Sequence, residues 1–198
     1  MAIPHNGLMG KVYAELDERL TQFISEQQLF FVATAPGELG HVNVSPKGYR
    51  DTFAVLGPRK VGYVDLTGSG VETIAHLRDD GRITVMFCSF SRQPKVLRLY
   101  GHGRVVLPSS ASWAEWAPRF PGAGRDGARA IVVIDVERIA DSCGYAVPLM
   151  EPAQERDMLE QWTGRRSCED LIRYHEEHNT VSIDGLPALP PGGASVSP

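Results

Sequence analysis

Residues 60–78, KVGYVDLTGSGVETIAHLR, combine an apolar strand, a Thr-Gly-Ser-Gly turn and the start of a helix. Such a junction directs free backbone N–H groups and the positive end of a helix dipole to one point, which favours a bound phosphate. Ser69 followed by Glu72 also fits a capping box, which needs no ligand. The capping box leaves Gly68 and Gly70 unexplained, whereas glycines allow the backbone to approach a ligand closely.

A second polar segment, Asn43 to Gly48, carries Ser45 and Lys47 at the end of another predicted strand. A lysine at a strand end is commonly only solvated. A strand end and a helix start can nevertheless converge on one anion in a small barrel. Together with the turn at 67–70, this segment indicates a phosphorylated cofactor.

Short apolar strands joined by short turns dominate the chain. Strands are predicted at residues 29–34, 41–46, 51–57, 60–66, 82–90, 95–107 and 129–140, and helices at 11–28, 69–79, 110–118, 152–163 and 167–178. Because only one strand–helix–strand unit occurs, a doubly wound parallel sheet is disfavoured. The sequence predicts a mainly β (α+β) fold, an antiparallel split β-barrel with flanking helices. Gly101 and Gly103 are expected to bend their strand, as barrel corners require.

The 198 residues suffice for one domain with a sizeable core. We assign residues 1–182 to a single domain that ends in the C-terminal helices, and residues 183–198 to an extended tail. The tail is rich in Pro, Gly and Ser, so its last ten residues are expected to be disordered.

Composition excludes several classes of partner. A net charge of −4 with scattered Lys and Arg provides no basic field for nucleic acid. No stretch approaches the ~20 apolar residues of a membrane span, and the N-terminus lacks the pattern of a secretory signal. Cys88, Cys143 and Cys168 are far apart and odd in number, which argues against a disulfide framework. We therefore expect a cytoplasmic protein with no nucleic-acid or membrane partner.

Isolated charged and titratable side chains give weaker signals. Arg98 has apolar neighbours on both sides of its predicted strand, and a charge there needs a partner. An ion pair with Asp65 or Asp135 is favoured over a ligand. His175 and His178 stand three apart on a helix and could chelate a metal, but a solvated helix face is the favoured interpretation. No metal site is predicted, and no catalytic acid or base can be identified.

The order of these segments resembles that of the pyridoxamine 5′-phosphate oxidase-like family of flavin-binding split barrels over residues 15–140. The resemblance rests on VNVSPKG, then DLTGSGVETIAHLRDDGRITVMFC, then LRLYGHGRVV. A subfamily of small bacterial proteins looks most similar. The resemblance implies a homodimer that binds FMN in symmetric clefts at its interface and acts on a small-molecule substrate or electron donor.

The same resemblance implies which residues hold FMN. Lys47 would reach the phosphate or the polar edge of the flavin, and the helix start would hold the phosphate. Arg98 could approach the flavin or the neighbouring subunit, while Tyr145 and residues 179–186 would fold over the flavin of the partner. The implied cofactor-binding residues are Asn43, Val44, Ser45, Lys47, Tyr63, Val64, Asp65, Thr67, Ser69, Gly70, Thr73 and Arg98.

Two departures from the family pattern argue against oxidation of pyridoxamine phosphate. True oxidases carry an Arg-Lys pair after the Gly-Ser of the turn, where this chain has Gly70 and Val71. They also end in an arginine-containing segment for substrate, whereas Ser182 to Pro187 contains no arginine. The sequence thus predicts an FMN-dependent oxidoreductase of unknown substrate. A non-catalytic flavin-binding or sensing protein, or a split barrel that uses deazaflavin F420 or haem, remains the alternative.

Overall fold

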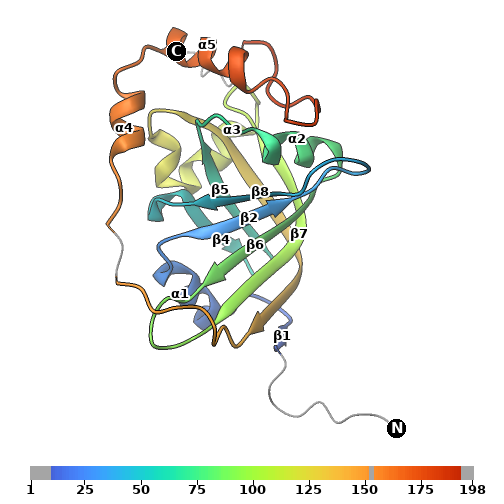
Figure 1. The fold of residues 1–198 in the computed structure, drawn as a ribbon, viewed down its shortest axis with the longest axis vertical. Coiled ribbons are helices and arrows are strands. Elements are labelled where there is room, and N and C mark those ends of the chain that lie inside the picture. Colours follow the sequence, from blue (N-terminus) through green and yellow to red (C-terminus); the bar gives the residue numbers. More distant parts are fainter. Residues whose placement is uncertain (1–9, 152–153, 193–198) are drawn as a thin grey trace.

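The structure, a computed structural model, describes residues 10–151 and 154–192 and contains one antiparallel sheet flanked by helices (Figure 1). The strands are β1 (Val12–Tyr13), β2 (Phe30–Thr34), β3 (Asn43–Lys47), β4 (Phe53–Gly57), β5 (Lys60–Leu66), β6 (Arg82–Cys88), β7 (Val96–Val106) and β8 (Ala128–Ser142). The helices are α1 (Glu18–Glu26), α2 (Glu72–Asp79), α3 (Trp113–Trp116), α4 (Met158–Thr163) and α5 (Cys168–His178), with 3₁₀ turns at Arg50–Thr52, Ala117–Arg119 and Pro121–Gly124.

The strands pair in the order β3-β2-β6-β7-β8-β5-β4, and β1 pairs with β8. Along β7 the side chains alternate, so that Leu97 and Leu99 are buried while Tyr100 is exposed. The largest hydrophobic cluster joins these leucines to Leu20 and Ile24, which α1 contributes. The predicted mainly β split barrel with flanking helices is confirmed.

Close packing of β7 against β8 explains a glycine that the sequence analysis singled out. The register of this strand pair shifts between Tyr100 and Gly101. A Cβ atom at Gly101 would lie 2.1 Å from the carbonyl oxygen of Asp135, so no larger residue fits there without moving the backbone. The predicted irregularity at Gly101 is confirmed.

The first helix begins later than predicted. The sequence pattern suggested a helix over 11–28, but α1 starts at Glu18 because the Asp17 side chain accepts from Leu20 N at 2.8 Å as an N-cap. Val12 and Tyr13 instead form β1 along β8. The Tyr13 hydroxyl donates to the Asp141 carboxylate, which also ties this segment to the barrel.

The second helix also begins later than predicted and is not capped as expected. It starts at Glu72 with Val71 as N-cap, and no side chain caps it, so the capping box expected from Ser69 and Glu72 does not form. The helix ends at Asp79, as predicted. Gly81 follows the helix with φ of +88°, and its N–H donates to His76 O at 3.2 Å.

The chain after β8 returns to the end of the barrel that carries α2 (Figure 1). The helix predicted over 152–163 is shorter, since α4 covers Met158–Thr163, and residues 152–153 lie outside the described ranges. The helix predicted over 167–178 is α5, which starts with a capping box formed by Ser167 and Asp170.

The segment predicted as an extended tail is folded at least to residue 189. Val181 bridges to Pro187, and Ala188 and Leu189 are buried against α2 residues such as Ile74. Leu189 therefore belongs to a hydrophobic cluster, although it falls in the part expected to be disordered; residues 193–198 of that part lie outside the described ranges.

Two further features bear on the predictions from composition. The three cysteines are free, in agreement with the absence of a disulfide framework. Across residues 10–151 and 154–192, no helix is both long and apolar enough to cross a membrane.

Candidate functional site

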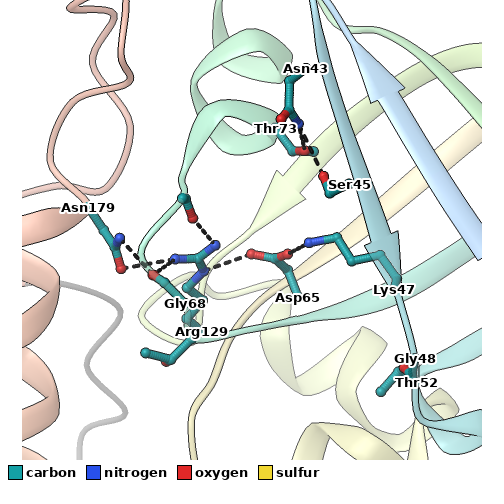
Figure 2. A network of polar contacts seen from close by, with 12 residues as sticks. Asn43, Ser45, Lys47, Gly48, Thr52, Asp65, Gly68, Thr73, Arg129 and Asn179 are labelled. Atoms are coloured by element: carbon teal, nitrogen blue, oxygen red, sulfur yellow. Dashed lines mark hydrogen bonds and ion pairs between the residues drawn. The ribbon is translucent and has the colours of Figure 1, made fainter. Parts of the chain in front are cut away.

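Most of the predicted site residues meet where β3, β5 and the start of α2 come together (Figure 2). Because side chains alternate along a strand, Asn43, Ser45 and Lys47 share the half-buried face of β3. Val44 lies on the opposite face and is 60% exposed. The structure therefore groups three of the four predicted β3 residues and separates Val44 from them.

The first polar cluster joins β3 to α2. Asn43 Nδ2 donates to Ser45 Oγ at 3.1 Å and to Thr73 Oγ1 at 3.2 Å. Thr73 lies in the first turn of α2. An amide and two hydroxyl groups thus surround the helix start that was predicted to hold an anion.

The second cluster contains a buried carboxylate between two cations. Lys47 Nζ and Arg129 Nε donate to the two oxygens of Asp65, each at 2.7 Å. Asp65 is 1% exposed and Arg129 is 3% exposed. Burial alone would raise the pKa of Asp65, but the charges and hydrogen bonds of Arg129 and Lys47 outweigh burial and lower its pKa to about 2. One negative and two positive groups leave this cluster with a net charge of +1.

The Thr-Gly-Ser-Gly turn is held from inside the protein. Arg129 donates from Nη1 to Gly68 O at 3.1 Å and from Nη2 to Gly70 O at 2.7 Å. Asn179, which follows α5, donates from Nδ2 to Gly68 O at 3.0 Å and to Ser69 O at 3.3 Å. The capping box at Ser69 does not form, because α2 begins at Glu72 with Val71 as N-cap and Ser69 lies two residues before that N-cap.

The start of the turn is fixed by a buried histidine. Thr67 Oγ1 donates to Gly127 O at 2.8 Å and lies 2.9 Å from His175 Nε2. Because the Thr67 hydroxyl donates its one proton to Gly127 O, the His175 Nε2 atom must be the donor to Thr67 Oγ1. Burial, followed by the charge of Arg129, lowers the pKa of His175 to about 4. His175 is thus a buried neutral residue, and the solvated helix face expected for it was wrong.

The outer side of the turn is open. A Cβ atom at Gly68 would meet no atom within 4 Å, and Ser69 and Gly70 are exposed. The Glu72 carboxylate approaches this side, since one of its oxygens lies 2.8 Å from the position of a Cβ atom at Gly70. The turn therefore leaves room for a ligand, with one flexible acidic side chain at its edge.

Two predicted residues on β5 are buried on opposite faces. Val64 packs in a separate cluster with Trp116 and Phe120, so the structure does not bring it to the site. Tyr63 shares the face of Asp65, and its hydroxyl has no hydrogen-bond partner within the described parts of the chain. Burial, followed by the charge of Asp65, raises the pKa of Tyr63 well above its ordinary value, so the hydroxyl stays protonated.

Arg98 does not join the site. Its guanidinium donates from Nη1 to Ser142 Oγ at 3.2 Å, and the ion pair expected with Asp65 or Asp135 is absent from the described structure. Asp65 is paired with Lys47 and Arg129, whereas Asp135 is paired with Lys60 at 3.0 Å. The ion pair predicted for Arg98 was wrong, since the buried cation paired with Asp65 is Arg129.

Three residues that hold the turn were not predicted in this role: Arg129 was not singled out, His175 was expected on a solvated helix face, and Asn179 was expected over the flavin of a partner. Arg129 opens the apolar run RAIVVIDV and carried the same signal as Arg98, a cation next to buried strand residues. No local pattern marked Asn179, which is 111 residues from Gly68. The expectation that residues 179–186 cover the flavin of a partner fails for Asn179, because it is buried within its own chain.

The described residues contain no group of three or more His, Cys, Asp or Glu that could hold a metal ion. Two cavities, of about 450 Å³ and 200 Å³, lie near α1 and include Arg50 and Gln27 in their walls. Their walls include none of the predicted cofactor residues.

The residues at the β3–β5–α2 junction fit the phosphate of a flavin nucleotide. Backbone N–H groups at an uncapped helix start and a local excess of positive charge attract anions. The donor set is thus made of hydroxyls, one amide, backbone N–H groups and Lys47, without the Arg-Lys pair of true oxidases.

Comparisons with known proteins agree with the fold and the order of motifs. The sequence model of pyridoxamine 5′-phosphate oxidase matches residues 16–143. The pyridoxamine 5′-phosphate oxidase family protein ustO of Aspergillus flavus is 40% identical over 193 residues, which cover 89% of this chain and 77% of ustO.

Solved structures show the same fold at low sequence identity. A variant of HupZ from group A Streptococcus has a TM-score of 0.51 with 23% identity, covering 64% of this chain and 98% of HupZ. A Lactobacillus delbrueckii protein provisionally described as a pyridoxamine 5′-phosphate oxidase has a TM-score of 0.50 with 17% identity, covering 67% of this chain and 98% of that protein. The chain belongs to the pyridoxamine 5′-phosphate oxidase family, as the residues matched by the family model, the identity with ustO and the barrel topology show.

Proposed function

We propose that this protein binds FMN with its phosphate at the start of α2 and acts as an FMN-dependent oxidoreductase on a small molecule. The observation that carries the proposal is the net positive cluster of Lys47, Asp65 and Arg129 directly behind an uncapped helix start. Bound FMN would supply the redox chemistry, while the protein binds the flavin and controls access to it.

Lys47 is suited to bind the phosphate because Asp65 keeps a second cationic partner when Lys47 also contacts an anion. Arg129 holds one oxygen of that carboxylate and is itself fixed by Gly68 and Gly70. The ammonium of Lys47 is partly exposed and lies on the same strand face as Asn43 and Ser45. These side chains, together with Thr73, would orient the phosphate and the adjacent ribityl chain.

We further propose that FMN lies at a homodimer interface that includes β3. This strand ends the sheet order, so one of its edges has no strand partner among the described residues. Val44 and Val42 are exposed there, and Ile183 is 73% exposed. His41 Nδ1 and Asp184 Oδ1, 2.7 Å apart, hold the segment of Ile183 beside the start of β3. This apolar surface supports association of two chains next to the proposed phosphate site.

The proposal is tested with freshly purified protein by its visible spectrum and by FMN retention after dialysis. We expect a flavin spectrum, and we expect Lys47→Ala to retain several-fold less FMN than the wild type. Lys60→Ala is the matched control, because Lys60 forms an exposed pair with Asp135 on the neighbouring strand. Unchanged FMN content in Lys47→Ala would contradict the site.

The same spectrum separates the alternatives. A Soret band would indicate haem, an F420 spectrum would indicate the deazaflavin, and colourless protein that takes up no FMN would reject flavin binding. FMN that no nicotinamide or other reductant reduces would favour a flavin-binding or sensing protein over an enzyme.

A further inference from the structure

In the Thr-Gly-Ser-Gly turn at residues 67–70, here called the cofactor turn, the carbonyl groups of Gly68, Ser69 and Gly70 point toward buried side chains. Gly68, Ser69 and Gly70 accept four hydrogen bonds, two from Arg129 and two from Asn179 (Figure 2). The carbonyls of three successive residues are therefore satisfied by only two side chains.

This arrangement fixes the direction of the N–H groups as well. In a trans peptide the C=O of one residue and the N–H of the next point in opposite directions. Carbonyls at 68–70 that face Arg129 and Asn179 therefore turn the N–H groups of Ser69, Gly70 and Val71 away from these two side chains. None of these N–H groups donates to a described residue. They precede the uncapped N–H groups of α2, and successive N–H groups form a nest for an anion.

Asn179 is chemically suited to this role. Its Oδ1 accepts from Arg129 Nη1 at 2.9 Å, while its Nδ2 donates to Gly68 O and Ser69 O. Only a side-chain amide offers both an acceptor and two donors in this space. The backbone of Asn179 is fixed too, because its N–H donates to His175 O at 2.8 Å and its carbonyl accepts from Leu189 N at 3.0 Å.

We propose that Asn179 is a positioning residue for phosphate recognition, which acts with Arg129 to keep the N–H groups of residues 69–71 directed at the phosphate. The inference rests on the proposed FMN site. Asn179 lies outside residues 16–143, the part that matches the family model. The segment after α5 is thus a functional part of the cofactor site rather than an appendage of the barrel.

The test compares the affinities for FMN and riboflavin, which differ only in the phosphate. Flavin-fluorescence titrations are made with wild type, Asn179→Ala and Asn179→Asp. The Asp variant keeps an acceptor for Arg129 but loses both Nδ2 donors. We expect both variants to lose about tenfold in FMN affinity, the size of one or two lost hydrogen bonds to the turn, and to change less than about twofold for riboflavin. Glu177→Gln, an exposed site on α5, is the control and should change neither affinity.

The outcomes separate this inference from the proposed function. If FMN and riboflavin affinities fall together, or if neither falls, the positioning role of Asn179 is overturned while FMN binding stands. If the wild type binds neither flavin, the proposed function fails and this inference fails with it. If Asn179→Ala does not fold, the Asp variant, checked by circular dichroism, decides the question alone.

Discussion

Arg98 on β7 and Arg129 at the start of β8 present the same local sequence pattern but differ in every contact. Arg98 is half-buried and, among the described residues, makes one hydrogen bond, to Ser142. Arg129 is buried, pairs with Asp65 and holds two carbonyls of the cofactor turn. A charge next to apolar strand residues therefore does not by itself mark a site. The segments that fold over the strand end decide whether the charge is buried and what it binds.

The largest expected effect follows directly from this contrast. Arg129→Met leaves the Asp65 carboxylate with Lys47 alone and leaves the turn carbonyls without their guanidinium donor. Breaking a buried pair in this way lowers the free energy of unfolding by about 3–5 kcal/mol. Arg98→Met removes one half-buried hydrogen bond and should cost less than about 1.5 kcal/mol. Urea unfolding of both variants measures the difference, and equal losses would remove the distinction between the two arginines.

The second-largest expected effect is a pH dependence of stability that arises from His175, which holds the start of the same turn. Its folded pKa of about 4 lies below the ordinary value of 6.5, so folding favours the neutral form. The contribution of His175 to the free energy of unfolding is fully present above pH 6.5 and is lost as the pH falls toward 4. Its upper limit is about 3 kcal/mol. Urea unfolding between pH 7 and pH 4.5 should show this loss in the wild type.

His175→Gln provides the comparison, because an amide can still donate to Thr67 but does not titrate. We expect its stability to fall less over the same pH range. His178→Gln, on the exposed side of α5, is the control and should follow the wild type. A His175→Gln variant with the pH dependence of the wild type would show that His175 is not the group responsible.

The smallest effect concerns the acidic side chain at the open side of the turn. Glu72 approaches Gly70, where a phosphate would experience its negative charge. Glu72→Gln should therefore tighten FMN binding by about two- to fivefold, the size of a partly screened repulsion. Riboflavin affinity should stay constant. Weaker FMN binding in this variant would place the phosphate elsewhere.

The sequence was sufficient for the barrel and for part of the site. Local sterics explain the alternation of side chains along β7 and the glycines at its bend. They also explain why Asn43, Ser45 and Lys47 lie on one face of β3. Thr67 and Thr73 were implied by the resemblance to the family, whose order of motifs places them at the helix start. Each of these inferences uses residues that are close together in the sequence.

The remaining contacts depend on segments that only the fold brings together. Asp65 and Arg129 are 64 residues apart, and Thr67 and His175 are 108 residues apart. The local capping signal of Ser69 was wrong, since no side chain caps α2; the contact that the turn makes at Ser69 comes instead from Asn179, which donates to the Ser69 carbonyl. Leu189, in a segment that looks disordered by composition, is ordered by burial against α2.

The most direct test of the central claim is a titration of the wild-type protein with FMN and with riboflavin under identical conditions. We expect FMN to bind at least about tenfold more tightly than riboflavin, because the phosphate adds charge-assisted hydrogen bonds to Lys47 and the turn. Equal affinities would contradict a phosphate site at the start of α2.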